Sequence, residues 1–112
     1  MPNITDNVSF DTVAREWRCK WDVSDDKKSL SECQSILDAA LSELKAVPGV
    51  KSVQRVVCGG CQDFKVITAL DASSFGAWEA NGFAPEGDFL AKLKEVGGVL
   101  RVETQTYTLM TM

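Results

Sequence analysis

The chain has 112 residues, a formal net charge of −4 and an apolar fraction of 45%, so we expect one folded domain rather than a disordered segment. The acidic balance and the lack of a basic stripe argue against nucleic-acid binding. No histidine is present, which removes histidine-based acid–base catalysis and most metal sites. The composition therefore predicts no catalytic centre, no cofactor and no bound metal.

No stretch approaches the roughly 20 apolar residues of a membrane span. The N-terminus has neither the basic region nor the hydrophobic region of a signal peptide. We accordingly expect a cytoplasmic protein without membrane contact, whose four cysteines are mostly reduced thiols. Residues 1–13 are polar with scattered apolar positions and predict an N-terminal arm before a single domain at 14–112. The alternative for the arm is a short strand or helix held by Val8, Phe10 and Val13.

Apolar and charged residues alternate strictly from position 16 to 23, which predicts a strand with one buried face. Trp17, Cys19 and Trp21 share the apolar face of this strand. Two tryptophans on one face are able to form a binding platform, but the pattern favours core packing.

A helix follows, because Ser29 and Glu32 have the spacing of a capping box. Apolar residues then recur at intervals of three and four, and the proline and glycine at 48–49 end the helix. The apolar face comprises Leu30, Cys33, Ile36, Leu37, Ala40, Leu41 and Leu44.

The centre of the chain, residues 50–71, predicts a β-hairpin around Gly59 and Gly60. Two glycines supply the positive φ values of a two-residue hairpin loop. The outgoing arm alternates cleanly, whereas the valines of the incoming arm change face and predict a bulge or burial on both sides.

The remaining third of the chain predicts a short amphipathic turn, a second helix and a last strand. Phe75, Trp78 and Phe83 suit a turn that lies over the sheet. The helix begins near Pro85 and ends at the glycines 97–98, and a threonine-rich β-prone run follows.

The order strand, helix, strand, strand, helix, strand predicts an α+β fold of the ferredoxin-like split β-α-β-β-α-β type. Right-handed crossovers place two helices on one face of a four-stranded antiparallel sheet. The other face then carries charged residues such as Arg18, Lys20, Lys65 and Glu103.

Cys58 and Cys61 flank the predicted turn and are the candidates for a redox pair or a metal site. A structural zinc ion needs about four ligands, and no second CxxC motif exists. A redox CxxC motif usually lies at a helix N-terminus, and this one lies on a turn. Ordinary turn-flanking cysteines are the favoured interpretation, with the redox and metal readings left open.

Residues 20–26, KWDVSDD, and the hairpin segment around the two glycines resemble the elongation factor 1-beta guanine-nucleotide-exchange domain. The resemblance implies a protein-binding module that acts on a translational GTPase, with Trp21, Asp22, Gly59 and Gly60 as binding residues. The chain ends in TYTLMTM and lacks the C-terminal Phe-Asn-Lys segment of that family, so no exchange residue can be carried over.

Two other functions remain open. The first is a homodimeric ferredoxin-like domain that binds a small metabolite, as in regulatory domains with similar turns before their strands. The second is a dimeric α+β barrel enzyme in which tryptophan and phenylalanine side chains line a cavity. Both need a dimer, whereas the exchange domain is expected to act as a monomer.

Overall fold

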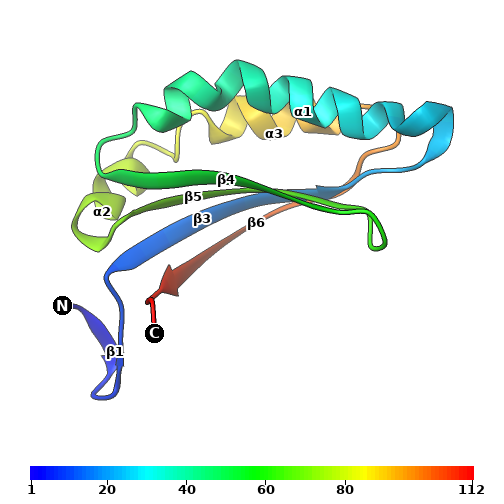
Figure 1. Cartoon of the computed structure of the whole chain (residues 1–112). Helices are drawn as coiled ribbons and strands as arrows, with labels where there is room; N and C mark the ends of the chain where they lie inside the picture. The colour runs from blue at the N-terminus through cyan, green and yellow to red at the C-terminus, as the bar shows by residue number, and fades with distance from the viewer.

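A computed structural model describes all residues from Met1 to Met112. Its centre is a four-stranded antiparallel sheet with the strand order β4-β5-β3-β6. The helices α1 and α3 lie together on one face of this sheet (Figure 1). This is the expected ferredoxin-like α+β fold. The elements concerned are β3 (Thr12–Lys20), α1 (Ser24–Lys45), β4 (Val50–Cys58), β5 (Asp63–Asp71), α3 (Glu86–Glu95) and β6 (Leu100–Leu109).

Three short elements supplement this frame. Helix α2 (Ala72–Ala80) follows β5 directly and occupies the region where a short amphipathic turn was expected. The strands β1 (Asn3–Thr5) and β2 (Val8–Ser9) pair in a small hairpin that projects from the body (Figure 1). The main sheet begins at Thr12, and the division of the chain into an arm at 1–13 and a domain at 14–112 stays a prediction.

No helix of the structure is both long enough and apolar enough to cross a membrane.

The core lies between the sheet and the helices. Trp17, Cys19 and Trp21 point to the helix side and are 1%, 2% and 3% exposed, so the prediction of core packing is confirmed. Strand β5 contributes its alternate residues to the same layer, because Phe64 pairs with Cys19 and Val66 pairs with Trp17. The helices complete the core with Cys33, Leu37, Leu44, Phe89 and Leu93.

The capping box predicted at Ser29 does not form. The Ser29 hydroxyl donates to Asp22 Oδ1 at 2.8 Å and accepts from the Asp22 backbone N–H at 3.1 Å, so it is not used to cap the helix. The three residues 25–27 have positive φ values of 53–62° and form a left-handed turn before the regular part of α1.

The predicted two-residue hairpin loop is also wrong. Cys58 pairs with Asp63, so the loop between β4 and β5 has the four residues 59–62. Positive φ occurs at Gln62 (58°) instead of at either glycine of the loop. Gln62 is fixed by Trp21, because the Trp21 backbone N–H donates to the Gln62 carbonyl at 3.0 Å and the Gln62 amide donates to the Trp21 carbonyl at 2.7 Å.

The bulge that was considered for the incoming arm is present. The pairing register of β4 with β5 shifts by one residue between Val50 and Ser52. Because of this shift, Val50 and Val53 lie on the same face, opposite Leu70 and Thr68, although they are three residues apart.

Candidate functional site

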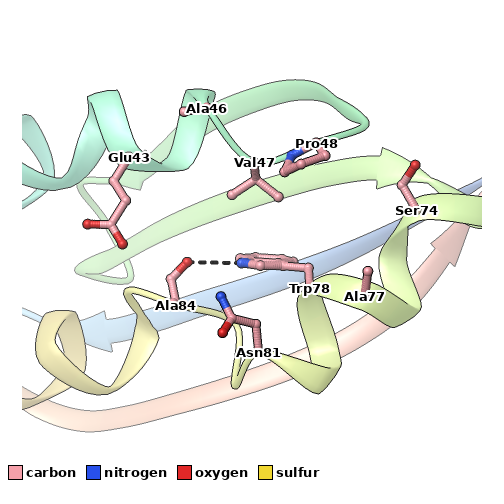
Figure 2. Close-up of a pocket in the computed structure, with 9 residues that line it drawn as sticks. All are labelled: Glu43, Ala46, Val47, Pro48, Ser74, Ala77, Trp78, Asn81 and Ala84. Atoms are coloured by element: carbon pink, nitrogen blue, oxygen red, sulfur yellow. Dashed lines mark hydrogen bonds between the residues drawn. The ribbon is translucent and has the colours of Figure 1, made fainter.

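A pocket of about 460 Å³ opens at the end of the molecule where α1 passes into β4 (Figure 2). Its walls come from the C-terminal end of α1, from α2 and from the segment between α2 and α3. Five of the nine lining residues are hydrophobic. The full lining comprises Glu43, Ala46, Val47, Pro48, Ser74, Ala77, Trp78, Asn81 and Ala84.

Trp78 forms the floor of this pocket. Its side chain is only 4% exposed, and its indole N–H donates to the Ala84 carbonyl at 2.9 Å. Phe75 and Phe83 pack edge-on against the indole, with ring centroids 6.0 and 5.1 Å away. The position of the indole is therefore fixed before any ligand arrives.

The opposite wall depends on the turn that ends α1. Val47 and Pro48 lie across the pocket from Trp78 (Figure 2). Gly49 follows with φ 85°, and any side chain at this position would collide with Ser74 of α2. The glycine therefore permits the close approach that places Ser74 at the edge of the pocket.

Three polar side chains surround the apolar floor: Glu43 from α1, Ser74 from α2 and Asn81 just beyond α2. Glu43 is the only ionisable residue of the lining, and its carboxylate points toward the segment with Ala84 (Figure 2). An apolar cavity with a few polar groups at its edge is typical of a small-molecule site. The lining places one carboxylate, one hydroxyl and one amide beside the apolar floor.

A half-buried ion pair, Arg15 with Glu86, adjoins the aromatic cluster formed by Phe75, Trp78 and Phe83. Arg15 donates to Glu86 through Nε at 2.8 Å, and the Trp17 indole N–H donates to the same carboxylate at 2.7 Å. The Arg15 guanidinium also lies 4.2 Å from the centroid of the Phe83 ring. Because Phe83 packs on Trp78, this network helps to hold the pocket floor in place.

The outer face of the sheet contains a second polar centre. Glu16 is 5% exposed; its Oε1 accepts from the Tyr107 hydroxyl at 3.1 Å, and its Oε2 has no hydrogen-bond partner. Arg18 approaches that oxygen to 3.6 Å. Burial of the phenol, together with its bond to Glu16, raises the pKa of Tyr107 to about 12.

A shallow groove beside this centre is rich in basic residues. Lys20 forms an ion pair with Asp63 at 2.5 Å, and its hydrogen bond to Asp63 lowers the pKa of that carboxyl. Arg18 pairs with Glu103 at 3.3 Å. We name this the basic groove; it is lined by Arg18, Cys19, Lys20, Asp63, Lys65, Arg101 and Glu103.

The binding residues predicted from the family resemblance do not form one site. Trp21 is buried and its indole N–H donates to the Asp63 carbonyl at 3.1 Å, so its ring belongs to the core. Asp22 accepts hydrogen bonds from Ser24 and Ser29. Gly59 and Gly60 lie exposed in the hairpin loop, with no atom close to the position of an added side chain.

The two cysteine pairs differ in state. Cys58 and Cys61 form a disulfide with a Cα–Cα distance of 5.6 Å, whereas all four cysteines were expected to be mostly reduced. Cys19 and Cys33 are free thiols with their sulfurs 3.9 Å apart in the core. Their mutual hydrogen bond and burial raise the pKa of Cys19. No group of three or more possible metal ligands exists in the structure.

Sequence reasoning missed most of the pocket. Aromatic residues around a cavity were expected only for the dimeric barrel enzyme, and of the tryptophans and phenylalanines Trp78 alone lines this pocket. Glu43 lay on the polar side of a helix and gave no signal of its own. Arg15 and Glu86 are 71 residues apart, so no local pattern connects them.

No protein-family model matches the chain, and no curated protein matches its sequence. Solved structures do match over nearly the whole length. Rv0793 from Mycobacterium tuberculosis is 17% identical with a TM-score of 0.61, over 90% of this chain and 97% of that one. A mutant form of SnoaB, a cofactor-independent oxygenase from Streptomyces nogalater, is 15% identical with a TM-score of 0.60, over 91% and 96%.

A third structure extends this similarity. It is a monooxygenase from the gene ActVA-Orf6 of Streptomyces coelicolor in complex with the ligand Nanaomycin D, at 12% identity and a TM-score of 0.66, over 92% and 90% of the two chains. At such identities the likeness shows the fold alone.

These matches correct the suspected relation to elongation factor 1-beta. SnoaB is a cofactor-independent oxygenase, the Streptomyces coelicolor protein is a monooxygenase, and a further match from Deinococcus radiodurans is described as an antibiotic biosynthesis monooxygenase; none of these is an exchange factor. The sequence resemblance rested on a strand, a turn and an element order that the ferredoxin-like fold shares among unrelated functions. The predictions of guanine-nucleotide exchange, a role in translation and a GTPase partner lose their basis.

Proposed function

We propose that this protein is a homodimeric domain that binds a small aromatic metabolite in the Trp78 pocket. The observation that carries the proposal is a preformed apolar pocket whose floor is an oriented indole. The proposal is supported by the similarity in fold to a monooxygenase whose structure contains the ligand Nanaomycin D.

The lining indicates the chemistry of the ligand. A flat aromatic ring stacks favourably on an indole, and its apolar surface is covered by Val47 and Pro48. Hydroxyl or carbonyl groups at the edge of such a ligand can exchange hydrogen bonds with Ser74 and Asn81. A phenolic two-ring compound such as 1-naphthol has these features and serves as a probe.

The test is a calorimetric titration of the protein with 1-naphthol. Ala77→Phe places a ring inside the pocket, and we expect it to weaken binding at least about tenfold. Ala80→Phe adds the same ring to α2 at an exposed position that does not line the pocket, and it should leave binding unchanged. Equal affinity in all three proteins would place the ligand elsewhere.

One observation favours a second candidate function, oxygenation of the bound phenol. Glu43 is the only ionisable group of the pocket and can take the proton of a phenol, whose anion then reacts with O₂. For 1-naphthol the balanced reaction consumes one O₂ and gives the naphthoquinone and one water. The fold similarity to SnoaB, a cofactor-independent oxygenase, agrees with such chemistry.

Oxygen uptake in the presence of 1-naphthol separates the two candidates. With the enzyme function, we expect Glu43→Gln to reduce uptake about 100-fold while binding persists. Glu79→Gln changes a carboxylate on α2 that is not in the pocket and should have no effect. Binding without any uptake would support the binding domain and contradict the oxygenase.

We place the interface of the proposed homodimer on the outer face of the sheet. Val56 and Leu109 are 38% and 42% exposed on that face, among charged residues of both signs. A face with apolar residues and both charges can complement a second copy of itself across a twofold axis.

Two neighbouring valines test this interface. Val56 pairs with Lys65 and lies on the outer face, whereas Val57 pairs with Phe64 and lies on the helix side, and both are about 40% exposed. We expect Val56→Glu to give monomers in light scattering and Val57→Glu to remain dimeric. A monomeric wild-type protein would contradict the dimer without affecting the binding test.

A further inference from the structure

The hairpin between β4 and β5 ends in an accessible disulfide. Cys58 is the last residue of β4, and Cys61 lies in the four-residue loop that follows. Figure 1 shows this loop at the far end of the hairpin, bent away from the helices. The side chain of Cys61 is exposed and that of Cys58 is half-buried, so an external thiol reaches Cys61 first.

The two sulfurs differ in their ability to carry negative charge. The Cys61 backbone N–H points at Cys58 Sγ, with 3.2 Å between nitrogen and sulfur. A hydrogen bond of this kind strengthens when its acceptor becomes an anion. A thiolate with a stabilised charge is also the better leaving group in thiol–disulfide exchange. The geometry therefore favours attack on Cys61 and departure of Cys58.

The basic groove lies directly beside the disulfide. Lys20, one of its residues, donates to the Cys61 carbonyl at 2.9 Å, and Asp63, another, is the cross-strand partner of Cys58. The groove contains four basic and two acidic side chains. Lys65 and Arg101 form no ion pair within the chain, so both are available to an external anion wherever the outer face is not covered by a second copy of the chain.

We propose that the Cys58–Cys61 disulfide is a thiol–disulfide exchange site for a small anionic thiol of the glutathione class, which the basic groove receives through Lys65 and Arg101. The two carboxylates of glutathione match the two unpaired cations, and its thiol then meets the exposed sulfur. This site is separate from the Trp78 pocket in both location and chemistry.

The reaction has two balanced steps. In the first, the glutathione thiolate attacks Cys61 Sγ; a bond forms between these sulfurs, the Cys58–Cys61 bond breaks, and Cys58 leaves as a thiolate. In the second, another glutathione thiolate attacks the glutathione sulfur of the mixed disulfide. Glutathione disulfide and the Cys61 thiolate are released, both protein thiolates take up protons from water, and the protein disulfide has been reduced by two electrons.

The buried cysteine pair provides an internal control. Cys19 and Cys33 lie in the core as free thiols and are only 2% and 0% exposed in the folded protein. Any modification of these two residues reports unfolding rather than exchange.

The first experiment mixes the folded, oxidised protein with reduced glutathione, traps the products by acid and locates them by mass spectrometry. We expect the trapped glutathione on Cys61 in roughly tenfold excess over Cys58, with Cys19 and Cys33 untouched. Adduct divided equally between Cys58 and Cys61 would overturn the assignment of roles. A disulfide that reacts only after denaturation would overturn the site itself.

The second experiment tests the groove. Combined Lys65→Gln and Arg101→Gln should slow exchange with glutathione about tenfold and leave exchange with cysteamine, a cationic thiol, no slower than before. Combined Lys45→Gln and Lys94→Gln removes the same charge from the helix layer and serves as the matched control. Equal slowing with both thiols would show a damaged loop and overturn recognition by the groove.

Discussion

Two arginines three residues apart on β3 differ in exposure and in partners, because they lie on opposite faces of the sheet. Arg15 points to the helix side, where its side chain is 16% exposed and binds Glu86, Thr104 and Thr106. Arg18 points outward, where its side chain is 38% exposed and pairs with Glu103, itself 52% exposed. The same residue type is enclosed on one face and accessible on the other.

The difference separates a structural role from a role in recognition. The partners of Arg15 come from α3 and β6, so this arginine joins three elements around the aromatic cluster. An exposed pair such as Arg18 and Glu103 contributes little to stability, because water screens both charges. The charges of the outer face therefore remain available for a second copy of the chain or for an anionic ligand.

The largest expected effect is a loss of stability on substitution of a buried residue on the helix face of the sheet. Trp21→Ala should lower the free energy of unfolding by about 3–5 kcal/mol, because it leaves a cavity and removes the hydrogen bond to Asp63. Val23→Ala, two residues further and 59% exposed, should change it by less than about 0.5 kcal/mol. Denaturant unfolding measures both, and a loss under about 1 kcal/mol for Trp21→Ala would contradict the packing of this face.

The second effect compares the two ion pairs directly. Glu86→Gln should cost about 2 kcal/mol, because Arg15 keeps its charge in a poorly solvated position. Glu103→Gln removes the partner of Arg18 and should cost less than about 0.5 kcal/mol. Denaturant midpoints at low and high salt provide the measurement. Equal costs for the two substitutions would abolish the distinction between the faces.

The sequence predicts the faces of the sheet better than it predicts the site. Strict alternation around Trp17 and Trp21 specifies which residues enter the core, because a slip of one residue would expose both rings. The same periodicity locates the apolar side of α1. These local patterns are sufficient for the order of the elements and hence for the ferredoxin-like arrangement.

The pocket and the loop depend on contacts that no local pattern contains. The glycines 59–60 predicted a two-residue loop. In the structure, the backbone carbonyl and the side-chain amide of Gln62 both form hydrogen bonds with the backbone of Trp21. This contact between distant residues accompanies a four-residue loop. Glu43 of α1 and Ser74 of α2 line one pocket, and the close approach of Ser74 to the end of α1 requires a glycine at position 49. The apparent family resemblance failed for a related reason: it compared short segments of a fold that many functions share.

The smallest expected effect is the loss of stability at high pH when Tyr107, which is hydrogen-bonded to Glu16 on the outer face, loses its proton. Tyr107 is the only tyrosine, so tyrosinate absorbance reports this residue alone, and we expect a pKa of about 12 against an ordinary value of 10.0. The unfolded chain then loses the phenol proton at lower pH than the folded one does. The stabilisation is complete below pH 10 and disappears as the pH rises to about 12.

Since part of the ring contacts water, the loss of stability should be only about 1 kcal/mol. Glu16→Gln removes the carboxylate that accepts the hydrogen bond of the phenol but keeps the burial, which is the larger cause of the shift. The pKa of Tyr107 should therefore fall only part of the way to 10.0 in this variant. Glu103→Gln, on the same face but without contact to Tyr107, should leave the titration unchanged. An ordinary titration in the wild-type protein would mean that water reaches the Tyr107 phenol freely, and the outer face would then lack the enclosed centre that distinguishes it from a plain charged surface.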